Sequence, residues 1–331
     1  MSALSKFETP EPAEDQLIAS IADILQRKME RDYPPGATRR DAHAKHVALV
    51  RAVFTVEPDL PPELRVGLFS RPCSYDAWVR LSNANGEPQS DAIADVRGCA
   101  IKVLGVAGAR IAESDEPAVQ DFLMVSMPTM PLGTVKLFHD AIYYSIESTM
   151  LLFVAKMLLT GRAATLKAMR RVQLHPTSPV DIRYWSTTPY LFGPEQAAKY
   201  SVVPTSSRRS TLPATRTDTY LSDNLEQHLA EADASFDFKL QLRTQPTMPI
   251  EDAAVEWTEA QSPFVKVAAL RIPKQNFRSA ERDEMSERLA FSPAHAGVDH
   301  RPIGAVNRAR MRIYKLLSSF RHARDQRAPA P

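Results

Sequence analysis

The sequence contains few cysteines and few glycines, and each scarcity excludes a class of protein. Only two cysteines, Cys73 and Cys99, occur among 331 residues. A disulfide framework is therefore excluded, and a reducing compartment such as the cytoplasm is favoured. Only 11 glycines are present, and none belongs to a glycine-rich phosphate loop, which argues against a nucleotide-binding fold. Basic and acidic residues nearly balance, at 41 and 39, so nucleic-acid binding is not expected.

Long hydrophobic runs are missing as well. The most apolar stretch, residues 141–160, is interrupted by Glu147 and Lys156, which leaves an uncharged centre too short for a transmembrane segment. We expect a buried or surface-docking helix here, or an apolar helix that lines an access channel for a lipid-like substrate. The first residues, MSALSKFETPEPAEDQ, hold acids and prolines where a signal peptide needs an apolar run.

Short β-prone segments dominate the remaining chain. Helical spacing marks residues 15–31, about 132–172 and about 303–322. The segments predicted as strands are 47–56, 75–82, 98–106, 122–127, 198–204, 235–243 and 264–272. Because strands and helices do not alternate along the chain, a parallel doubly wound sheet is not expected. The pattern favours an α+β fold, an antiparallel β-barrel with surrounding helices.

The chain is predicted to form one domain. We expect residues 17–323 to make up this domain, because no low-complexity linker or internal repeat divides them. Residues 1–16 are expected to be a disordered or loosely docked leader, and residues 324–331 a frayed tail.

The last predicted helix carries an informative group of side chains. On a helix, Arg310 and Tyr314 share one face, and Arg321 follows on the same face nearly two turns later. A guanidinium beside a phenol favours the phenolate, and ferric haem is one of the few cofactors that bind a tyrosinate. A solvated basic helix with a half-buried tyrosine would show the same pattern. The helix alone therefore does not decide between the two.

Four further motifs precede this helix. They are RDAHAK at 40–45, VRLS at 79–82, DVRGCAIK at 95–102 and AFSP at 290–293. Each has an ordinary structural explanation when it is taken alone. A single histidine is usually a satisfied structural residue, and the two middle motifs fit strands with polar outward faces.

Taken together, in this order and spacing, the motifs resemble the haem-binding core of the catalase family. Catalases carry Arg-x-x-His-Ala-Lys, Val-Arg-Phe-Ser, Asp-x-Arg-Gly-Phe-Ala-x-Lys and Ala-Phe-Asp-Pro, followed by Arg-x-x-x-Tyr and a second arginine. The resemblance runs along most of residues 39–322. It implies a haem b enzyme that reacts with hydrogen peroxide or organic hydroperoxides as a catalase or peroxidase, with a small-molecule peroxide as its partner.

The resemblance also implies roles around the haem. Tyr314 would bind the ferric iron as a phenolate that Arg310 supports. The haem propionates would pair with three arginines, since forked guanidinium–carboxylate bonds suit a buried dianionic edge. These arginines are Arg40, Arg80 and Arg321.

On the opposite face of the haem, His43 would move the peroxide proton from one oxygen to the other. Ser82 would bond to the other ring nitrogen and fix the tautomer of this histidine. The family has a distal asparagine, but no asparagine lies between Lys102 and Pro128. Gln120 or Asp121 is the expected substitute that polarises the peroxide.

Other departures point to a subgroup. Cys99 replaces a family phenylalanine, and the chain ends soon after the last helix, so the pattern is similar to the minimal catalase-related haem proteins. That subgroup includes allene oxide synthases and enzymes that cleave fatty-acid hydroperoxides. In allene oxide synthases a threonine precedes the distal histidine, whereas Ala42 stands here, which favours peroxide turnover. A fatty-acid hydroperoxide lyase or isomerase, and a non-catalytic haem or lipid carrier, remain as alternatives. We expect a homodimer or a monomer.

Overall fold

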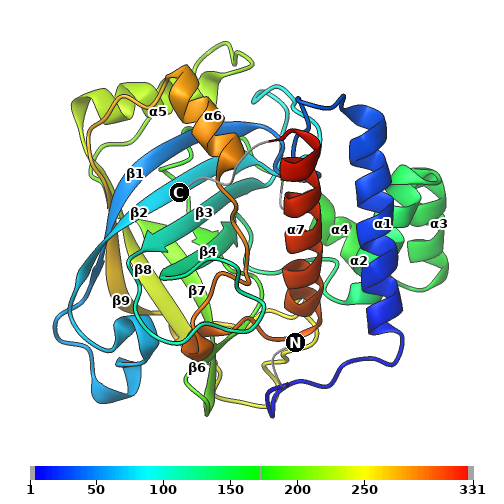
Figure 1. The fold of residues 1–331 in the computed structure, drawn as a ribbon, viewed down its shortest axis with the longest axis horizontal. Coiled ribbons are helices and arrows are strands. Elements are labelled where there is room, and N and C mark those ends of the chain that lie inside the picture. The colour runs from blue at the N-terminus through cyan, green and yellow to red at the C-terminus, as the bar shows by residue number, and fades with distance from the viewer. Residues whose placement is uncertain (1–3, 172, 327–331) are drawn as a thin grey trace.

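A nine-stranded antiparallel sheet forms the centre of the structure, a computed structural model that describes residues 4–171 and 173–326. In chain order the strands are β1 (His46–Val56), β2 (Ser74–Asn83), β3 (Arg97–Leu104), β4 (Val119–Val125), β5 (Tyr184–Trp185), β6 (Tyr190–Phe192), β7 (Gln196–Pro204), β8 (Ala234–Leu242) and β9 (Val265–Ile272). They pair in the order β5-β4-β3-β2-β1-β9-β8-β7-β6. Because β5 also pairs with β7, the sheet closes into a barrel (Figure 1).

The expected antiparallel barrel with surrounding helices is thus confirmed. Each of the seven predicted strand segments overlaps a strand of the barrel. The two strands that were not predicted are β5 and β6, which have two and three residues. Strands this short do not show the alternation of polar and apolar residues on which the prediction depends.

Aromatic side chains fill the inside of the barrel. The ring centroid of Phe238 lies 5.0 Å from that of Phe54 and 4.8 Å from that of Phe122, both in edge contact. All three side chains are buried. The barrel interior is therefore a packed hydrophobic core.

Helices cover the outside of the barrel. They are α1 (Glu14–Asp32), α2 (Val135–Ile146), α3 (Met150–Leu159), α4 (Ala163–Arg171), α5 (Tyr220–Glu231), α6 (Ala280–Arg288) and α7 (Ala305–Arg324), with short 3₁₀ turns at Pro62–Leu64, Gly67–Phe69 and Val298–His300. The helices expected at both ends of the chain are confirmed as α1 and α7. The expected helical stretch over 132–172 is divided into α2, α3 and α4, while α5 and α6 were not predicted.

Threonine caps explain the division between α2 and α3. The hydroxyl oxygen of Thr134 accepts a hydrogen bond from the backbone N–H of Leu137, and that of Thr149 accepts one from Leu152. Each threonine satisfies a backbone donor that a helix start leaves without a partner. Gly161, with φ of 71°, then ends α3 in the left-handed region.

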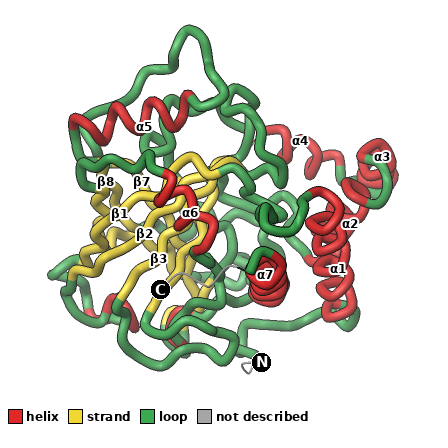
Figure 2. Tube along the Cα trace, turned by 45° about the horizontal axis from the view of Figure 1, so that its top comes forward, coloured by secondary structure: helices red, strands yellow, loops and turns green. Residues whose placement is uncertain are grey.

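Helix α7 lies between α1 and the barrel. The tube in Figure 2 shows α7 between the strands and α1, with α2 beside α1. Apolar residues of α1 and α7 form a shared cluster in which Ile21 meets Ala309 and Ile313. This packing fixes α7 against the barrel wall, where the cavity described below lies.

The N-terminal segment packs against the start of α7. Glu8 is 9% exposed, and its carboxylate accepts hydrogen bonds from Arg301 at 2.7 Å and from Arg308 at 2.8 Å. Helix α1 begins at Glu14, inside the stretch expected to be a leader. The domain boundaries expected from the sequence stay predictions, and residues 1–3 and 327–331 lie outside the described residues.

Candidate functional site

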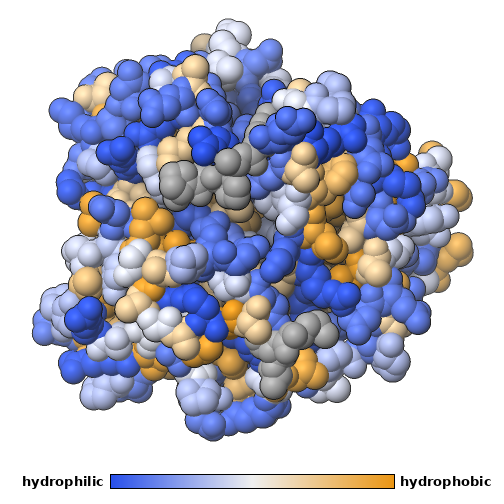
Figure 3. All heavy atoms as spheres, in the orientation of Figure 1, coloured by the Kyte–Doolittle hydropathy of each residue, from blue (hydrophilic) through white to orange (hydrophobic). Residues whose placement is uncertain are grey.

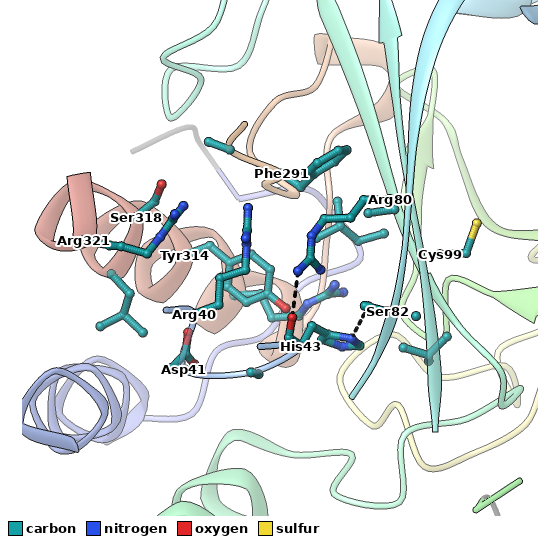
Figure 4. Close-up of a pocket in the computed structure, with 18 of the residues that line it drawn as sticks. Arg40, Asp41, His43, Arg80, Ser82, Cys99, Phe291, Tyr314, Ser318 and Arg321 are labelled. Atoms are coloured by element: carbon teal, nitrogen blue, oxygen red, sulfur yellow. Dashed lines mark hydrogen bonds between the residues drawn. The ribbon is translucent and has the colours of Figure 1, made fainter. Parts of the chain in front are cut away.

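A cavity of about 810 Å³, its open mouth included, lies between the barrel wall and α7 (Figure 4). Strands β2, β3 and β4 form one wall, α7 forms another, and two loops and α1 complete it. The described lining residues are Met29, Arg40, Asp41, Ala42, His43, Arg80, Ser82, Gly98, Cys99, Ala100, Leu123, Met124, Val125, Ala290, Phe291, Arg310, Tyr314, Leu317, Ser318 and Arg321.

His43 enters the cavity from the loop before β1. Its φ of 55° places the backbone in the left-handed region, which is uncommon for a residue other than glycine. The backbone N–H of His43 donates to the carbonyl oxygen of Ala84 at 3.1 Å, and that of Ala44 donates to Asn85 at 3.2 Å. These bonds hold the strained residue in place. Its Nδ1 lies 2.9 Å from Ser82 Oγ, so Nε2 is left for the cavity.

Gly98 of β3 gives the imidazole its position. A Cβ at Gly98 would lie 2.6 Å from Nδ1 of His43 and 2.6 Å from Oγ of Ser82. Both distances are far below a van der Waals contact, so only glycine allows the ring and the hydroxyl to approach the strand this closely. The glycine of the DVRGCAIK motif thus belongs to the site.

Burial and nearby positive charge keep His43 neutral. Burial is the main cause that lowers the pKa of His43 to about 3, and the guanidinium groups of Arg80, Arg310 and Arg40 contribute in the same direction. A neutral imidazole whose Nδ1 bonds to a hydroxyl can accept a proton at Nε2. Position 43 therefore supplies a base at neutral pH.

Three arginines surround one carboxylate at the edge of the cavity. Arg40 Nη1 and Arg321 Nη1 lie 3.1 Å and 3.6 Å from the same oxygen of Glu287. Arg80 donates to the carbonyl oxygen of His43 at 2.9 Å. Burial, followed by the charges of Arg40 and Arg321, lowers the pKa of Arg80 well below its ordinary value, although Glu287 acts against this. The local potential is therefore positive and suits an anionic ligand group.

Tyr314 faces the cavity from α7. The guanidinium of Arg310 lies 5.4 Å from the centroid of its ring, as the four-residue spacing predicts. Burial tends to lower the pKa of Arg310, but its interactions with the phenol groups of Tyr314 and Tyr190 outweigh burial and raise this pKa. Arg310 also donates to Thr188 Oγ1 at 3.3 Å, which fixes its side chain beside the phenol.

Cys99 belongs to β3, with its side chain in the hydrophobic core of the barrel and its sulfur turned away from Tyr314 in Figure 4. Burial raises the pKa of its thiol to about 12, so the sulfur stays protonated at neutral pH. Because a metal binds the thiolate rather than the thiol, Cys99 is not a candidate ligand.

Seven of the predicted site residues line this one cavity: His43, Ser82, Arg40, Arg80, Arg310, Arg321 and Tyr314. Figure 4 shows His43 with Ser82 on the barrel side and Tyr314 on α7. Residues from both ends of the chain therefore meet, and this is the arrangement on which the sequence-based prediction depended. Their chemical roles stay predictions.

The structure does not bring Gln120 and Asp121 to this cavity. Neither is among the described residues that line the cavity. Gln120 Oε1 accepts a hydrogen bond from the backbone N–H of Gly297 at 3.0 Å. Asp121 lies 2.8 Å from His295 and 3.1 Å from Lys102. Both side chains attach the loop before α7 to β4, and Leu123 and Val125 of that strand line the cavity instead.

The sequence-based prediction missed several residues of the site. Asp41 lines the cavity, and burial raises the pKa of its carboxyl to about 6. Its place inside the RDAHAK motif was a signal that could have identified it. Glu287 and Leu123 carried no such signal, because only the packing of α6 and β4 brings them to the cavity edge and wall.

The donor set fits haem. A phenol and an imidazole enter one cavity from different walls, the guanidinium cluster stands at its edge, and apolar side chains such as Leu123 and Phe291 complete it. The space that Gly98 leaves for His43 is part of the same fit. Within the described residues, no group of three or more His, Cys, Asp or Glu side chains could hold a bare metal ion.

Comparison with solved structures shows a catalase-like fold. The chain is similar to a bacterial catalase (TM-score 0.66, 16% identity), a fungal catalase (0.65, 17%) and catalase A from Saccharomyces cerevisiae (0.68, 16%). These alignments cover 99 to 100% of this chain but 66 to 70% of those chains, so the chain spans about two thirds of their length. No protein-family model and no curated protein matches the sequence.

Proposed function

We propose that this protein is a haem-dependent oxidoreductase, related to the minimal catalase-like haem proteins, that reacts with hydrogen peroxide or organic hydroperoxides. The observation that carries the proposal is the meeting of Tyr314 and His43 in one cavity beside a positive guanidinium cluster. The catalase-like fold supports it.

Residues of α7 and the barrel wall would hold the cofactor. The phenol oxygen of Tyr314 would hold the iron, with the guanidinium of Arg310 beside its ring. Arg40, Arg80 and Arg321 would pair with the two propionates through forked hydrogen bonds. When bound, haem would supply the ferric iron for cleavage of a peroxide O–O bond.

His43 would carry the proton during this reaction. Its neutral Nε2 accepts the proton of the bound peroxide oxygen and returns it to the leaving oxygen, while Nδ1 keeps its bond to Ser82. Burial, which lowers the pKa of His43 to about 3, keeps the ring neutral at neutral pH, so that one ring nitrogen has a lone pair. The packed surroundings keep the ring in one orientation.

One observation favours the organic substrates and, with them, a second candidate function. The described lining residues include no asparagine or glutamine, and Leu123 and Val125 of β4 face the cavity, while the side chain of Met124 belongs to the barrel core. An apolar wall of this kind suits the alkyl chain of a fatty-acid hydroperoxide better than a small polar peroxide. Rearrangement or cleavage of such a hydroperoxide is therefore the second candidate.

Two matched variants test the proposal by separating cofactor binding from turnover. Protein reconstituted with haemin should show a Soret band that Tyr314→Phe shifts or abolishes, because the axial ligand is lost. His43→Ala should keep the Soret band and slow peroxide cleavage by about 100- to 10,000-fold. Consumption of hydrogen peroxide and of a fatty-acid hydroperoxide is measured in parallel to separate the two candidate reactions. The proposal would be overturned if the chain did not bind haemin, or if the Soret band of Tyr314→Phe were the same as that of the wild type.

A further inference from the structure

Large apolar side chains stand exposed on α3. Leu151 is 79% exposed and Leu159 88% exposed, and three further residues of the helix, Met150, Leu152 and Leu158, are also exposed. The space-filling view in Figure 3 shows hydrophobic atoms at the margin of the molecule where α3 lies. Single exposed leucines are ordinary, but a group of them on one helix marks an interaction surface.

These exposed leucines are not part of the hydrophobic core. The opposite face of α3 carries Phe153 and Met157, which are buried against Leu137 and Ala141 of α2. Side chains of α4 pack on the same small cluster. The three helices are therefore held together from the inside, so folding does not explain the outer leucines.

Basic residues follow the apolar side chains along the chain. Residues 148–171 contain no Asp or Glu. Lys156 is neutralised by Asp140 of α2, whose carboxylate lies 2.9 Å from its Nζ. The other four basic residues of the segment are exposed, and no ion pair is found for them among the described residues: Arg162, Lys167, Arg170 and Arg171.

The position of α3 and α4 leaves this surface accessible. In both ribbon and tube views, α3 lies at the outer edge of the molecule, with α1 and α2 between it and α7 (Figures 1 and 2). Contact with a large flat partner on this side would therefore not need any movement of the barrel. None of the described helices is long and apolar enough to cross a membrane.

We propose that α3 and α4 dock the protein onto the surface of an anionic lipid membrane. The leucines of α3 would enter the boundary between headgroups and acyl chains, while the basic residues at the end of α3 and along α4 contact lipid phosphates. An apolar helix face flanked by lysine and arginine without acidic residues is the combination that such surfaces bind. Charge complementarity thus identifies the occupant as a membrane rather than a second copy of this equally basic surface.

The test is binding of the purified full-length chain to vesicles in sedimentation. Vesicles of pure phosphatidylcholine are compared with vesicles that contain phosphatidylglycerol, each at low and at high salt. We expect binding to the anionic vesicles that weakens as salt rises, since headgroup attraction is screened. This measurement does not depend on haem or on peroxide turnover, so it stands apart from the proposed function.

Two pairs of substitutions test the apolar part and the basic part of the surface separately. Leu151→Ser with Leu159→Ser should reduce vesicle binding by at least about tenfold, because two leucine side chains are no longer transferred from water into the membrane. Arg170→Ser with Arg171→Ser should reduce binding to anionic vesicles by on the order of tenfold. The basic pair keeps the test decisive if the leucine variant should fold poorly.

A matched control replaces exposed apolar residues elsewhere. Leu212 and Val255 are 45% and 40% exposed in loops, and Leu212→Ser with Val255→Ser should leave vesicle binding unchanged. The proposal is overturned if the chain does not bind anionic vesicles, or if it binds them no better than neutral ones. It is equally overturned if the wild-type chain is a dimer that does not bind vesicles, and if Leu151→Ser with Leu159→Ser abolishes that dimer.

Discussion

Close contacts at a few residues set the chemistry of the cavity. His43 carries its ring in a left-handed backbone conformation, bonded to Ser82 and pressed against Gly98. Such strain persists only where the surrounding structure holds it, and it is concentrated at functional sites. A substitution that adds one methyl group near the ring should therefore reduce activity and stability more than the small volume of that group suggests.

Gly98→Ala tests this dependence. The new methyl group would meet His43 Nδ1 and Ser82 Oγ at 2.6 Å, so the ring must move away from its position. We expect peroxide turnover to fall by about 100-fold, as a misplacement of about 1 Å can cause, and unfolding to become easier by about 1–3 kcal/mol. Steady-state kinetics and urea unfolding measure the two effects.

Gly297→Ala is the matched control for Gly98→Ala. A Cβ at Gly297 meets nothing closer than 3.6 Å, which is an ordinary contact. Activity and stability of this control should stay close to those of the wild type. Equal losses in both variants, or full activity of Gly98→Ala, would show that the close approach at β3 does not position His43.

Among the elements, α7 depends on partners from the far end of the chain. Apolar residues of α1 cover its outer face. At its start, the carboxylate of Glu8 accepts from Arg301, Arg308 and the backbone N–H of Gly304. Burial alone would raise the pKa of Glu8, but hydrogen bonds from Ser5, Arg308 and Gly304 outweigh it and lower this pKa. The N-terminal segment is thus part of the support for the helix that carries Tyr314.

Glu8→Ala should reveal this support. Removal of the carboxylate leaves the buried guanidinium of Arg301 without its anionic partner, which typically costs about 3–5 kcal/mol. The free energy of unfolding from urea titration should fall by an amount in that range. Glu11→Ala changes an exposed carboxylate in the same segment and should have little effect. If the two variants were equally stable, the segment would not support α7.

Across the whole molecule, a buried ionic network joins the barrel to the loop before α7. His295 lies 2.8 Å from Asp121 through Nδ1 and 2.8 Å from Asp115 through Nε2. Burial would lower the pKa of His295, but the charge of Asp121 and the hydrogen bonds to Asp115 and Asp121 outweigh it and raise this pKa to about 9. The network therefore contains a charged histidine at neutral pH.

This network predicts how stability changes with pH. The folded-state pKa of His295 lies above the unfolded value of about 6.5, so its contribution is fully present below that value. The contribution is lost as the pH rises through about 9, where the folded state releases the proton. Urea midpoints between pH 6.5 and 9 should therefore decline for the wild type and decline less for His295→Gln. Parallel curves for the two proteins would contradict the prediction.

The sequence by itself determined the barrel, its two terminal helices and most of the cavity. Alternation and helical spacing are local properties, so strands of normal length and α1 and α7 could be predicted from them. The ordered motifs identified His43, Tyr314 and the four arginines because each motif keeps its residues at a fixed local spacing.

Only the tertiary structure decided which neighbours of the motifs face the cavity. Gln120 and Asp121 belong to a strand that also lines the cavity, yet the loop around His295 covers them and binds their side chains. Glu287 reaches the arginines because α6 lies beside the barrel. Such contacts join residues far apart in sequence, and their geometry depends on the register of β4 and the course of the loops, which no local pattern encodes.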